Sequence, residues 1–275
     1  MRSLLGLCAL FLTLPSFALT ITSQIHDLDI TKSYDHNLVL LMSGDVVKIP
    51  RGDQALTNLL EKAKDDKAWI EFNLDEDREI LSVQSAAERI KDDSHLNSPE
   101  VLVYEPSVLN TYQEAQKIFK GLNPYYRNGS ECYNRAHVWS YESLTKHGLN
   151  SMKVFMFYTR KYIREYNFKW WFHVAPFTYV MENGSPSEKV LDYFFANNPL
   201  DTKKWTDIFM YNKAECPVIT KYTDYSQHEY ENWCYLFKTS MYYYQPLDLE
   251  ALENQGREKN NWVNWEVNNA YRQGF

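Results

Sequence analysis

The stretch Ser130-Glu131-Cys132-Tyr133-Asn134-Arg135-Ala136-His137 decides how this chain is interpreted, because it puts a cysteine at the predicted start of a helix. Ser130 is predicted to cap this helix, which runs from Glu131 to about His147 and ends at Gly148. The N–H groups of a first helical turn point toward the sulfur, and the helix dipole favours negative charge there. The position therefore predicts a thiol whose pKa is lowered toward the nucleophilic thiolate.

Cys132 is also the cysteine that lacks an obvious partner. Residues 1–18 have the features of a secretory signal peptide, with a positive start, a short apolar run and a small residue, Ala18, at the cleavage site. Its removal takes Cys8 away and leaves three cysteines. Cys216 and Cys234 lie in one aromatic-rich segment and are the expected disulfide pair. The sequence thus predicts a secreted or periplasmic protein with a free thiol at Cys132.

Composition and charge argue against several classes of protein. The formal net charge is −7 at pH 7, so nucleic acid is not an expected partner. Beyond the predicted signal peptide, no apolar run reaches the roughly 20 residues that a membrane span needs. The sequence contains no C-x-x-C pair, no H-E-x-x-H and no glycine-rich phosphate loop, so neither a metal nor a cofactor is expected. We expect a monomer.

Hydrophobic patterning predicts two domains after the signal peptide. Residues 19–90 form a small α/β domain, with strands at 46–49, 70–74 and 80–83 and a helix capped by Asp53. A polar linker follows at 91–103. The second domain, residues 104–275, has a helix that begins at Ser107, strands at 152–158, 168–180 and 189–195, and a polar helix after Pro246.

A histidine and an aspartate in the second domain complete a candidate triad with Cys132. His173 lies in the middle of the predicted strand 168–180, and Asp192 lies on the next predicted strand, across the turn. A nucleophilic cysteine needs a base beside it and a third group that orients the base. The order of a cysteine at a helix start, a histidine on a strand and an acid on the next strand is that of papain-like enzymes.

Each of these residues also has a plainer interpretation. A lone cysteine is more often a buried apolar residue or the partner of another molecule. A histidine in an aromatic strand is more often part of the core, and an aspartate at a strand end most often forms a turn. His137 lies about 140° around the helix from Cys132, so it is interpreted, like Arg135, as structural.

Several motifs, taken in order, resemble one known family. The stretch 131–137 resembles the C-Y-x-R-A-H nucleophile motif of the protein-glutaminases, the secreted protein deamidases. The stretch 171–175, Trp-Phe-His-Val-Ala, is similar to the W-x-Y-H-V-A histidine motif of that family. Val190-Leu191-Asp192 resembles its acid motif, and Asp201-Thr202-Lys203-Lys204-Trp205 resembles its downstream P-V-T-x-x-x-W segment. The resemblance covers roughly residues 104 to 250.

The resemblance implies a fold, an activity and three catalytic residues. The implied fold is α+β: a papain-like or transglutaminase-like domain with the cysteine-bearing helix on an antiparallel sheet, preceded by a small α/β domain. The implied activity is hydrolysis of the side-chain amide of protein-bound glutamine through a thioester, which releases ammonia. Cys132 is the implied nucleophile, His173 the base and Asp192 the residue that orients the base. The implied substrates are glutamine-containing proteins or peptides.

Three points remain open at the level of sequence. The family usually has proline and serine after the catalytic aspartate, where this chain has Tyr193 and Phe194, so Asp201 is a second candidate acid. Residues 19–90 are either a pro-region that blocks the site, as in known family members, or an accessory domain. The same triad also serves cysteine proteases and transglutaminases, and a secreted binding module with a structural cysteine is a further alternative.

Overall fold

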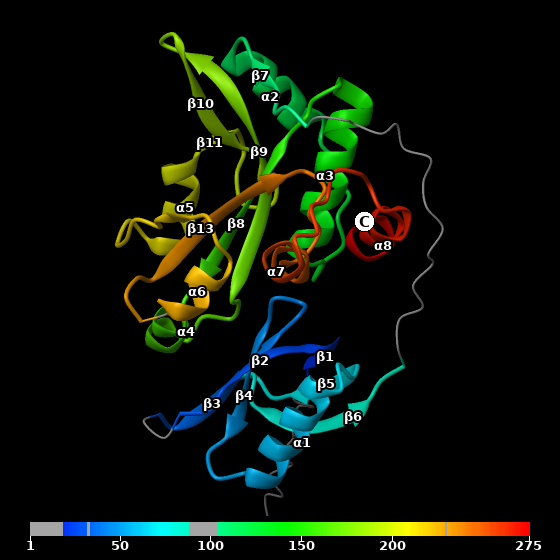
Figure 1. Ribbon diagram of the computed structural model, residues 1–275, viewed down its shortest axis with the longest axis vertical. Coiled ribbons are helices and arrows are strands. Elements are labelled where there is room, and N and C mark those ends of the chain that lie inside the picture. The colour runs from blue at the N-terminus through cyan, green and yellow to red at the C-terminus, as the bar shows by residue number, and fades with distance from the viewer. Residues whose placement is uncertain (1–18, 32–33, 88–103, 229) are drawn as a thin grey trace, which may run out of the picture. The chain divides into compact units, whose positions relative to one another are not determined.

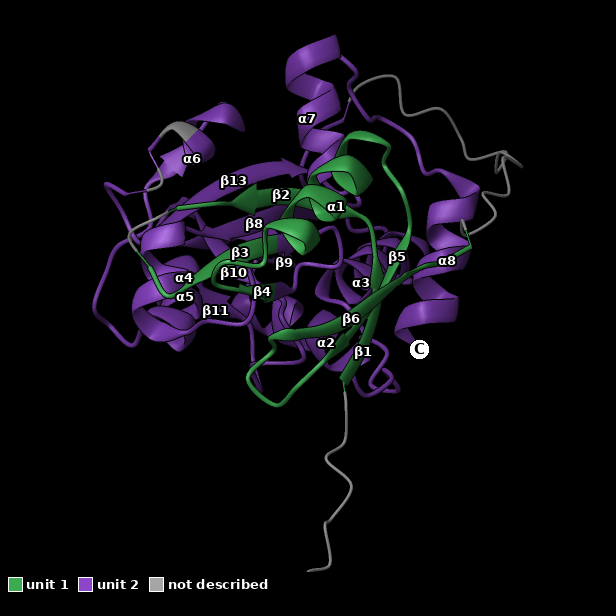
Figure 2. Ribbon diagram, turned by 90° about the horizontal axis from the view of Figure 1, so that it is seen from below, with its two compact units in different colours: residues 1–39, 47–87 green, residues 40–46, 88–275 purple. Residues whose placement is uncertain are grey.

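The computed structural model describes residues 19–31, 34–87, 104–228 and 230–275. The predicted signal peptide, residues 1–18, and the predicted linker, residues 91–103, lie outside the described residues. The chain divides into two compact units, one formed by residues 1–39 and 47–87 and the other by residues 40–46 and 88–275 (Figure 2). The second unit therefore includes a short segment, 40–46, from the region in which patterning predicts the N-terminal domain.

The first unit is a small mixed α/β structure with strands in two three-stranded sheets. One sheet has the order β1-β5-β6 (Leu19–Ser23, Ile70–Leu74 and Ile80–Ser85), and the other has the order β2-β3-β4 (Ile25–Asp29, His36–Leu41 and Val46–Pro50). Helix α1 (Gln54–Asp65) starts after Asp53, whose carboxylate accepts the N–H of Leu56 at 2.9 Å. The predicted helix cap is thus present, because an aspartate oxygen satisfies a first-turn donor.

The second unit is built on a seven-stranded sheet with the order β11-β10-β9-β8-β13-β12, and β7 pairs with β9 off this path. The strands are β7 (Val108–Leu109), β8 (Met152–Tyr158), β9 (Phe172–Glu182), β10 (Ser185–Val190), β11 (Leu200–Asp201), β12 (Val218–Ile219) and β13 (Cys234–Ser240). Strands β8, β9, β10, β11 and β13 are antiparallel to their neighbours in this group, whereas β7 and β12 pair in parallel. The expected mixture of helices with an antiparallel sheet is confirmed.

Helices cover this sheet. They are α2 (Tyr112–Gly121), α3 (Cys132–His147), α4 (Arg160–Tyr166), α5 (Thr202–Met210), α6 (Thr223–Gln227), α7 (Pro246–Gln255) and α8 (Asn264–Gly274). Helix α3 packs on β9 and α8 packs on α3, whereas α5 lies along β10 and β11 (Figure 1). Within the described ranges, no helix has the length and hydrophobicity that a bilayer crossing requires.

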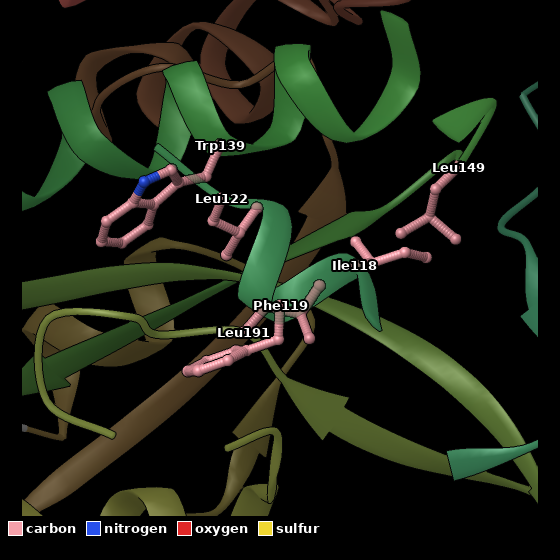
Figure 3. Packing of buried hydrophobic residues seen from close by; sticks show 6 residues of the cluster. All are labelled: Ile118, Phe119, Leu122, Trp139, Leu149 and Leu191. Atoms are coloured by element: carbon pink, nitrogen blue, oxygen red, sulfur yellow. The ribbon is translucent and has the colours of Figure 1, made fainter. Parts of the chain in front are cut away.

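One apolar cluster fixes the position of the chain after β10 (Figure 3). Its buried members are Ile118, Phe119, Leu122, Trp139, Leu149 and Leu191. Trp139 comes from α3, Phe119 from α2, and Leu191 directly follows β10. Burial of such side chains stabilises a fold by roughly 1.5–3 kcal/mol each. The cluster therefore holds the residue that precedes Asp192 against the helix that begins with Cys132.

Three sequence predictions in this unit were wrong in detail. Helix α2 begins at Tyr112 and not after Ser107, because the Thr111 hydroxyl accepts the N–H of Glu114 and residues 108–109 pair with β9 instead. Strand β10 ends at Val190, so Asp192 lies in a loop. The region after Pro246 contains two helices, α7 and α8, where one polar helix was expected, because Gly256 ends the first in a left-handed conformation.

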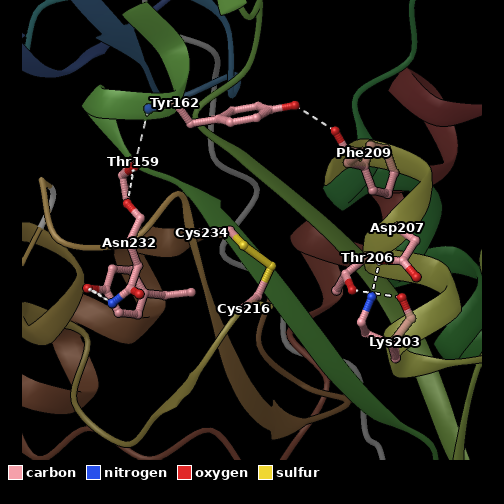
Figure 4. The surroundings of a disulfide bond; sticks show 10 residues. Thr159, Tyr162, Lys203, Thr206, Asp207, Phe209, Cys216, Asn232 and Cys234 are labelled. Carbon is pink, nitrogen blue, oxygen red and sulfur yellow. Dashed lines mark hydrogen bonds and ion pairs between the residues drawn. A yellow bond between two sulfur atoms is a disulfide. The ribbon is translucent and has the colours of Figure 1, made fainter. Parts of the chain in front are cut away.

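The predicted disulfide between Cys216 and Cys234 is present and ties the segment before β12 to the start of β13 (Figure 4). It closes a loop with a sequence separation of 18 residues. We expect the double variant Cys216→Ser/Cys234→Ser to lose about 3 kcal/mol of unfolding free energy, because the unfolded chain regains the freedom that the cross-link removes. Urea unfolding of the variant and of the wild type measures the loss. Equal midpoints would show that the bond does not stabilise the fold.

Candidate active site

Cys132 is the first residue of α3. The residue before the helix is Glu131 and not Ser130, whose hydroxyl instead accepts a hydrogen bond of 2.8 Å from Arg135 Nη1. The cap prediction was therefore wrong by one residue, because the Ser130 hydroxyl accepts a hydrogen bond from Arg135 and not from a main-chain N–H of the first helical turn. Among the described cysteines, Cys132 is the free one, and it is partly exposed. Helix α3 packs on β9, and the main-chain amide of Val174 on that strand interacts with the thiol.

The pKa of the Cys132 thiol does not follow the sequence expectation. Burial raises it to about 12, and the nearby Arg135 guanidinium and the Val174 amide only partly oppose this. A helix start by itself lowers a thiol pKa, because the helix dipole stabilises the thiolate. Here, burial destabilises the thiolate by more than the helix dipole, Arg135 and the Val174 amide stabilise it. Although the residue as a whole is partly exposed, its thiol is surrounded by protein, and this burial favours the neutral form.

His173 and Asp192 are bonded to each other in the interior of the second unit. The Nε2 atom of His173 lies 2.7 Å from Oδ2 of Asp192, and the two residues are only 3% and 1% exposed. The indole N–H of Trp205, on α5, donates to the same carboxylate oxygen at 2.9 Å. The N–H of Phe194 donates to the other oxygen at 3.3 Å. The carboxylate is thus fixed from three sides.

The register of the sheet brings these two residues together. His173 is the second residue of β9, opposite Met156 on β8, and Val190 on β10 is opposite Phe177. The N–H of Leu191 continues the pairing by donating to Pro176 O at 2.8 Å. Asp192 therefore leaves the sheet beside the start of β9. The sequence predicted this neighbourhood from the spacing of the two strands but not the register.

The carboxyl group of Asp192 is set up to stay ionised. Burial alone would raise its pKa, but the imidazole of His173 and the Trp205 indole outweigh burial and hold the pKa below its usual value. Because Nε2 of His173 is engaged by this carboxylate, Nδ1 is the ring nitrogen left to exchange a proton. No hydrogen bond joins the Cys132 thiol to the His173 ring within the described residues.

The ring of His173 is enclosed by aromatic side chains. Phe195, Trp205 and Phe209 lie with their ring centroids 5.2, 5.7 and 4.9 Å from that of the imidazole. Sequence analysis had quoted Trp205 only as part of a motif and had given it no role. Its hydrogen bond to Asp192 is a feature that depends on the position of α5, which no local pattern reveals.

Two other residues named from the sequence lie elsewhere. Asp201, the second candidate acid, precedes α5 and pairs with Lys189 and with Lys204, so its carboxylate is engaged away from the imidazole. His137 is fully buried, and its Nδ1 lies 2.8 Å from the ammonium of Lys153. Burial and that ammonium lower the pKa of His137 well below its usual value. A buried neutral histidine of this kind agrees with the structural interpretation.

Residues 40–46 contact the segment that leads into β9, within the second unit. The Gly44 carbonyl accepts the N–H of Trp171 at 2.9 Å, and the N–H of Val46 donates to Lys169 O at 2.8 Å. The Trp171 indole donates to Leu41 O at 2.6 Å. Sequence analysis missed this contact, because main-chain pairing of two distant segments leaves no motif.

Gly44 is required at its position for two reasons. Its φ is +98°, which side-chain-bearing residues rarely adopt, and a Cβ atom there would lie 3.1 Å from the ring of Phe172. Phe172 in turn stacks on Tyr133, the neighbour of Cys132, at 6.3 Å between ring centroids. Residues 40–46 are therefore linked through packed rings to the start of the cysteine-bearing helix.

Comparisons with known proteins find a family model and solved structures that this chain resembles. Residues 108–209 match the family model described as glutaminase. Among curated proteins, no sequence matches the chain. A crystal structure of pro-protein-glutaminase is 14% identical, with a TM-score of 0.52 over 83% of this chain and 84% of that one. The A47Q2 mutant of pro-protein-glutaminase is 13% identical, with a TM-score of 0.53 over 92% and 98% of the two chains.

A third structure is less similar as a whole. The NMR structure of protein-glutaminase from Chryseobacterium proteolyticum is 16% identical, with a TM-score of 0.35 over 51% of this chain and 77% of that one. The segment matched by the family model contains Cys132, His173 and Asp192. The resemblance to the protein-glutaminases therefore holds on two counts, since residues 108–209 match the glutaminase family model and the chain has the fold of pro-protein-glutaminase.

Proposed function

We propose that this protein is a secreted cysteine amidohydrolase that converts protein-bound glutamine to glutamate and releases ammonia. The observation that carries the proposal is the buried His173–Asp192 pair, which lies with Cys132 inside the segment that matches the glutaminase model. A thiol nucleophile needs a histidine that is oriented by a carboxylate through one ring nitrogen and can accept the thiol proton at the other. The match supports glutamine as the substrate side chain.

The proposed reaction has two halves. In the first, Nδ1 of His173 takes the thiol proton while the sulfur of Cys132 attacks the carboxamide carbon. The tetrahedral intermediate then collapses to a thioester, and His173 gives its proton to the departing ammonia. In the second half, His173 deprotonates a water molecule that attacks the thioester, and the thiol is restored as glutamate leaves. The N–H of Cys132 at the helix start stabilises the oxyanion, and Asp192 keeps the ring oriented.

Ammonia release from casein tests the proposed reaction against its alternatives. A deamidase releases ammonia and leaves both the backbone and the number of chains unchanged. Cleaved casein would favour a cysteine protease, and cross-linked casein would favour a transglutaminase. Casein that stays unchanged, even after the N-terminal region has been cut away from the folded chain, would favour a binding module with a structural cysteine.

We also propose that residues 104–275 are the catalytic domain and that residues 19–90 restrain it until the chain is cut. The main-chain bonds between residues 40–46 and the segment before His173 support this. The Cys216–Cys234 disulfide supports secretion, in line with a signal peptide at residues 1–18. The substrates are glutamine-containing proteins, and the protein acts as a monomer without nucleic acid.

We predict that Gly44→Val weakens this restraint. The valine side chain collides with Phe172, and the positive φ of Gly44 is strained for a branched residue, so residues 40–46 should release the segment before β9. The expected result is a roughly tenfold or greater increase in both ammonia release and iodoacetamide labelling of Cys132 at pH 8, because displacement of Phe172 also loosens its stacking on Tyr133, the neighbour of Cys132.

Gly52→Val is the matched control for this variant. Gly52 also has a positive φ, +86°, but a Cβ atom there meets nothing within 4 Å, and the residue lies outside residues 40–46. It therefore reproduces the backbone strain without the collision with Phe172. Labelling and ammonia release that stay at the wild-type rate in Gly44→Val, while its thermal unfolding shows a folded protein, would refute the restraint.

A further inference from the structure

A pocket of about 340 Å³ opens beside the His173–Asp192 pair. Its lining residues are Phe119 and Lys120 from α2, Tyr126 from the loop before α3, and the run from Tyr193 to Asn197 after the candidate acid. Phe119 packs on Tyr193 at 5.1 Å between ring centroids, and Tyr126 packs on Phe194 at 5.0 Å. The walls of the pocket are thus two pairs of aromatic rings from segments far apart in the sequence.

The pocket shares one wall with the candidate active site. Phe195 lines it and also packs edge-on against the imidazole of His173, at 5.2 Å between centroids. Phe194 lines it and donates its N–H to the carboxylate of Asp192. The same short segment therefore orients the catalytic pair and forms one wall of the pocket.

The chemistry of the lining indicates what the pocket accepts. Phe194 is 39% exposed, although the Arg135 guanidinium lies 4.2 Å from the centroid of its ring, so part of the ring is open to a ligand in the pocket. Lys120 is exposed at the rim and makes no ion pair or hydrogen bond within the described residues, so its ammonium is available to a carboxylate. A volume of about 340 Å³ is at the lower end of the roughly 300–1,000 Å³ that ligand sites occupy. It suits one large side chain and not a folded surface.

We propose that this pocket is a substrate subsite that takes a large apolar or aromatic side chain close to the reactive glutamine, with an acidic residue next to it held by Lys120. This inference rests on the proposed deamidase activity, and it states which residues around the substrate glutamine the enzyme prefers. Tyr193 and Phe194, which directly follow Asp192, supply two of the rings of the pocket. The aromatic rings bind the apolar side chain, and the lysine selects the sign of the adjacent charge.

The test uses synthetic peptides with a single glutamine. In the first set, phenylalanine or alanine occupies each of the three positions on either side of the glutamine in turn. The full chain is assayed for ammonia release before and after it is cut at a protease site inserted between residues 88 and 103. We expect phenylalanine at one position to raise kcat/KM roughly tenfold or more over alanine, because a filled apolar pocket discriminates by about that factor.

Two variants with matched controls assign the preference to the pocket. Phe194→Ala should bring the ratio of kcat/KM for the phenylalanine peptide over the alanine peptide down to about one, because the ring that would contact the phenylalanine is lost. The ratio is the measure, because the main-chain N–H of Phe194 also contacts Asp192 and a change there would affect both peptides alike. The exposed Tyr125, which does not line the pocket, provides the control Tyr125→Ala. The second set of peptides has glutamate or lysine beside the phenylalanine. The wild type should prefer the glutamate peptide, and Lys120→Glu should prefer the lysine peptide. Lys117→Glu, on the same helix but outside the pocket, should keep the preference of the wild type.

Failure of the subsite and failure of the proposed activity give different results. Equal kcat/KM for all peptides, in the wild type and in both pocket variants, would overturn the subsite while leaving deamidation in place. If no peptide is deamidated before or after cutting, calorimetry with Cys132→Ala decides the subsite alone. Tighter binding of the phenylalanine peptide, lost in Cys132→Ala/Phe194→Ala, would support the pocket, and equal binding of the two peptides would overturn it.

Discussion

Cys132→Ala abolishes ammonia release from casein, with an expected loss of at least about 10³-fold in kcat, because no other group in the site can form the covalent intermediate. Cys132 lies at the surface end of α3 and is partly exposed, so its loss should leave the fold intact. Ammonia release by the full chain, assayed before and after cutting between residues 88 and 103, measures the effect. The matched control is the disulfide variant Cys216→Ser/Cys234→Ser, which removes the other two described cysteines and should retain activity at a temperature where it is folded.

Retention of activity by Cys132→Ala would contradict the proposed mechanism. The thermal unfolding curve of the variant must overlay that of the wild type, so that a loss of activity is not a loss of folding. Peptide binding measured by calorimetry should also persist, since the variant removes the nucleophile and not the substrate contacts.

Asp192→Asn lowers kcat by about 10³- to 10⁴-fold with a much smaller effect on KM, by analogy with the acid of serine-protease triads. An asparagine of the same shape can donate its N–H₂ to Nε2 of His173, which would move the ring proton to Nδ1 and leave no base for the thiol. The indole of Trp205 donates to the same carboxylate oxygen that His173 contacts, so the amide N–H₂ would also leave the indole without its acceptor, and thermal unfolding checks that the variant is folded.

Asp201→Asn is the matched control for this prediction. Asp201 was the second candidate acid, but its carboxylate pairs with Lys189 and Lys204 and makes no bond to His173. Its substitution should change kcat by no more than about twofold, because weakening a partly exposed ion pair costs little stability. A large loss in Asp201→Asn together with a small loss in Asp192→Asn would reverse the assignment of the acid.

The local features of the site were accessible from the sequence. A cysteine at a helix start, a histidine in an aromatic strand and an aspartate near the next strand could be recognised from residue type and spacing, although the aspartate was predicted on that strand and lies in the loop after it. The disulfide partners followed from the count of cysteines that remain after a signal peptide. These predictions depend on short segments, and short segments are governed by local conformational rules.

Features that depend on tertiary packing were not accessible. The hydrogen bond from Trp205 to Asp192 requires α5 to lie along β10 and β11. The pairing of residues 40–46 with the segment before β9 joins parts of the chain more than a hundred residues apart. The helix dipole predicted a lowered thiol pKa at Cys132, but the pKa is raised, because burial depends on all the surrounding segments at once.

The most direct test of the account is mass spectrometry of a single-glutamine peptide incubated with the protein in heavy-oxygen water. The enzyme should be cut beforehand between residues 88 and 103, and Cys132→Ala should be run beside it. We predict that the glutamine becomes glutamate carrying one heavy oxygen, with the backbone intact and with no change in the variant, because water hydrolyses a thioester at Cys132. Heavy oxygen at a cleaved backbone carboxylate, a cross-linked peptide, or equal conversion by Cys132→Ala would contradict it.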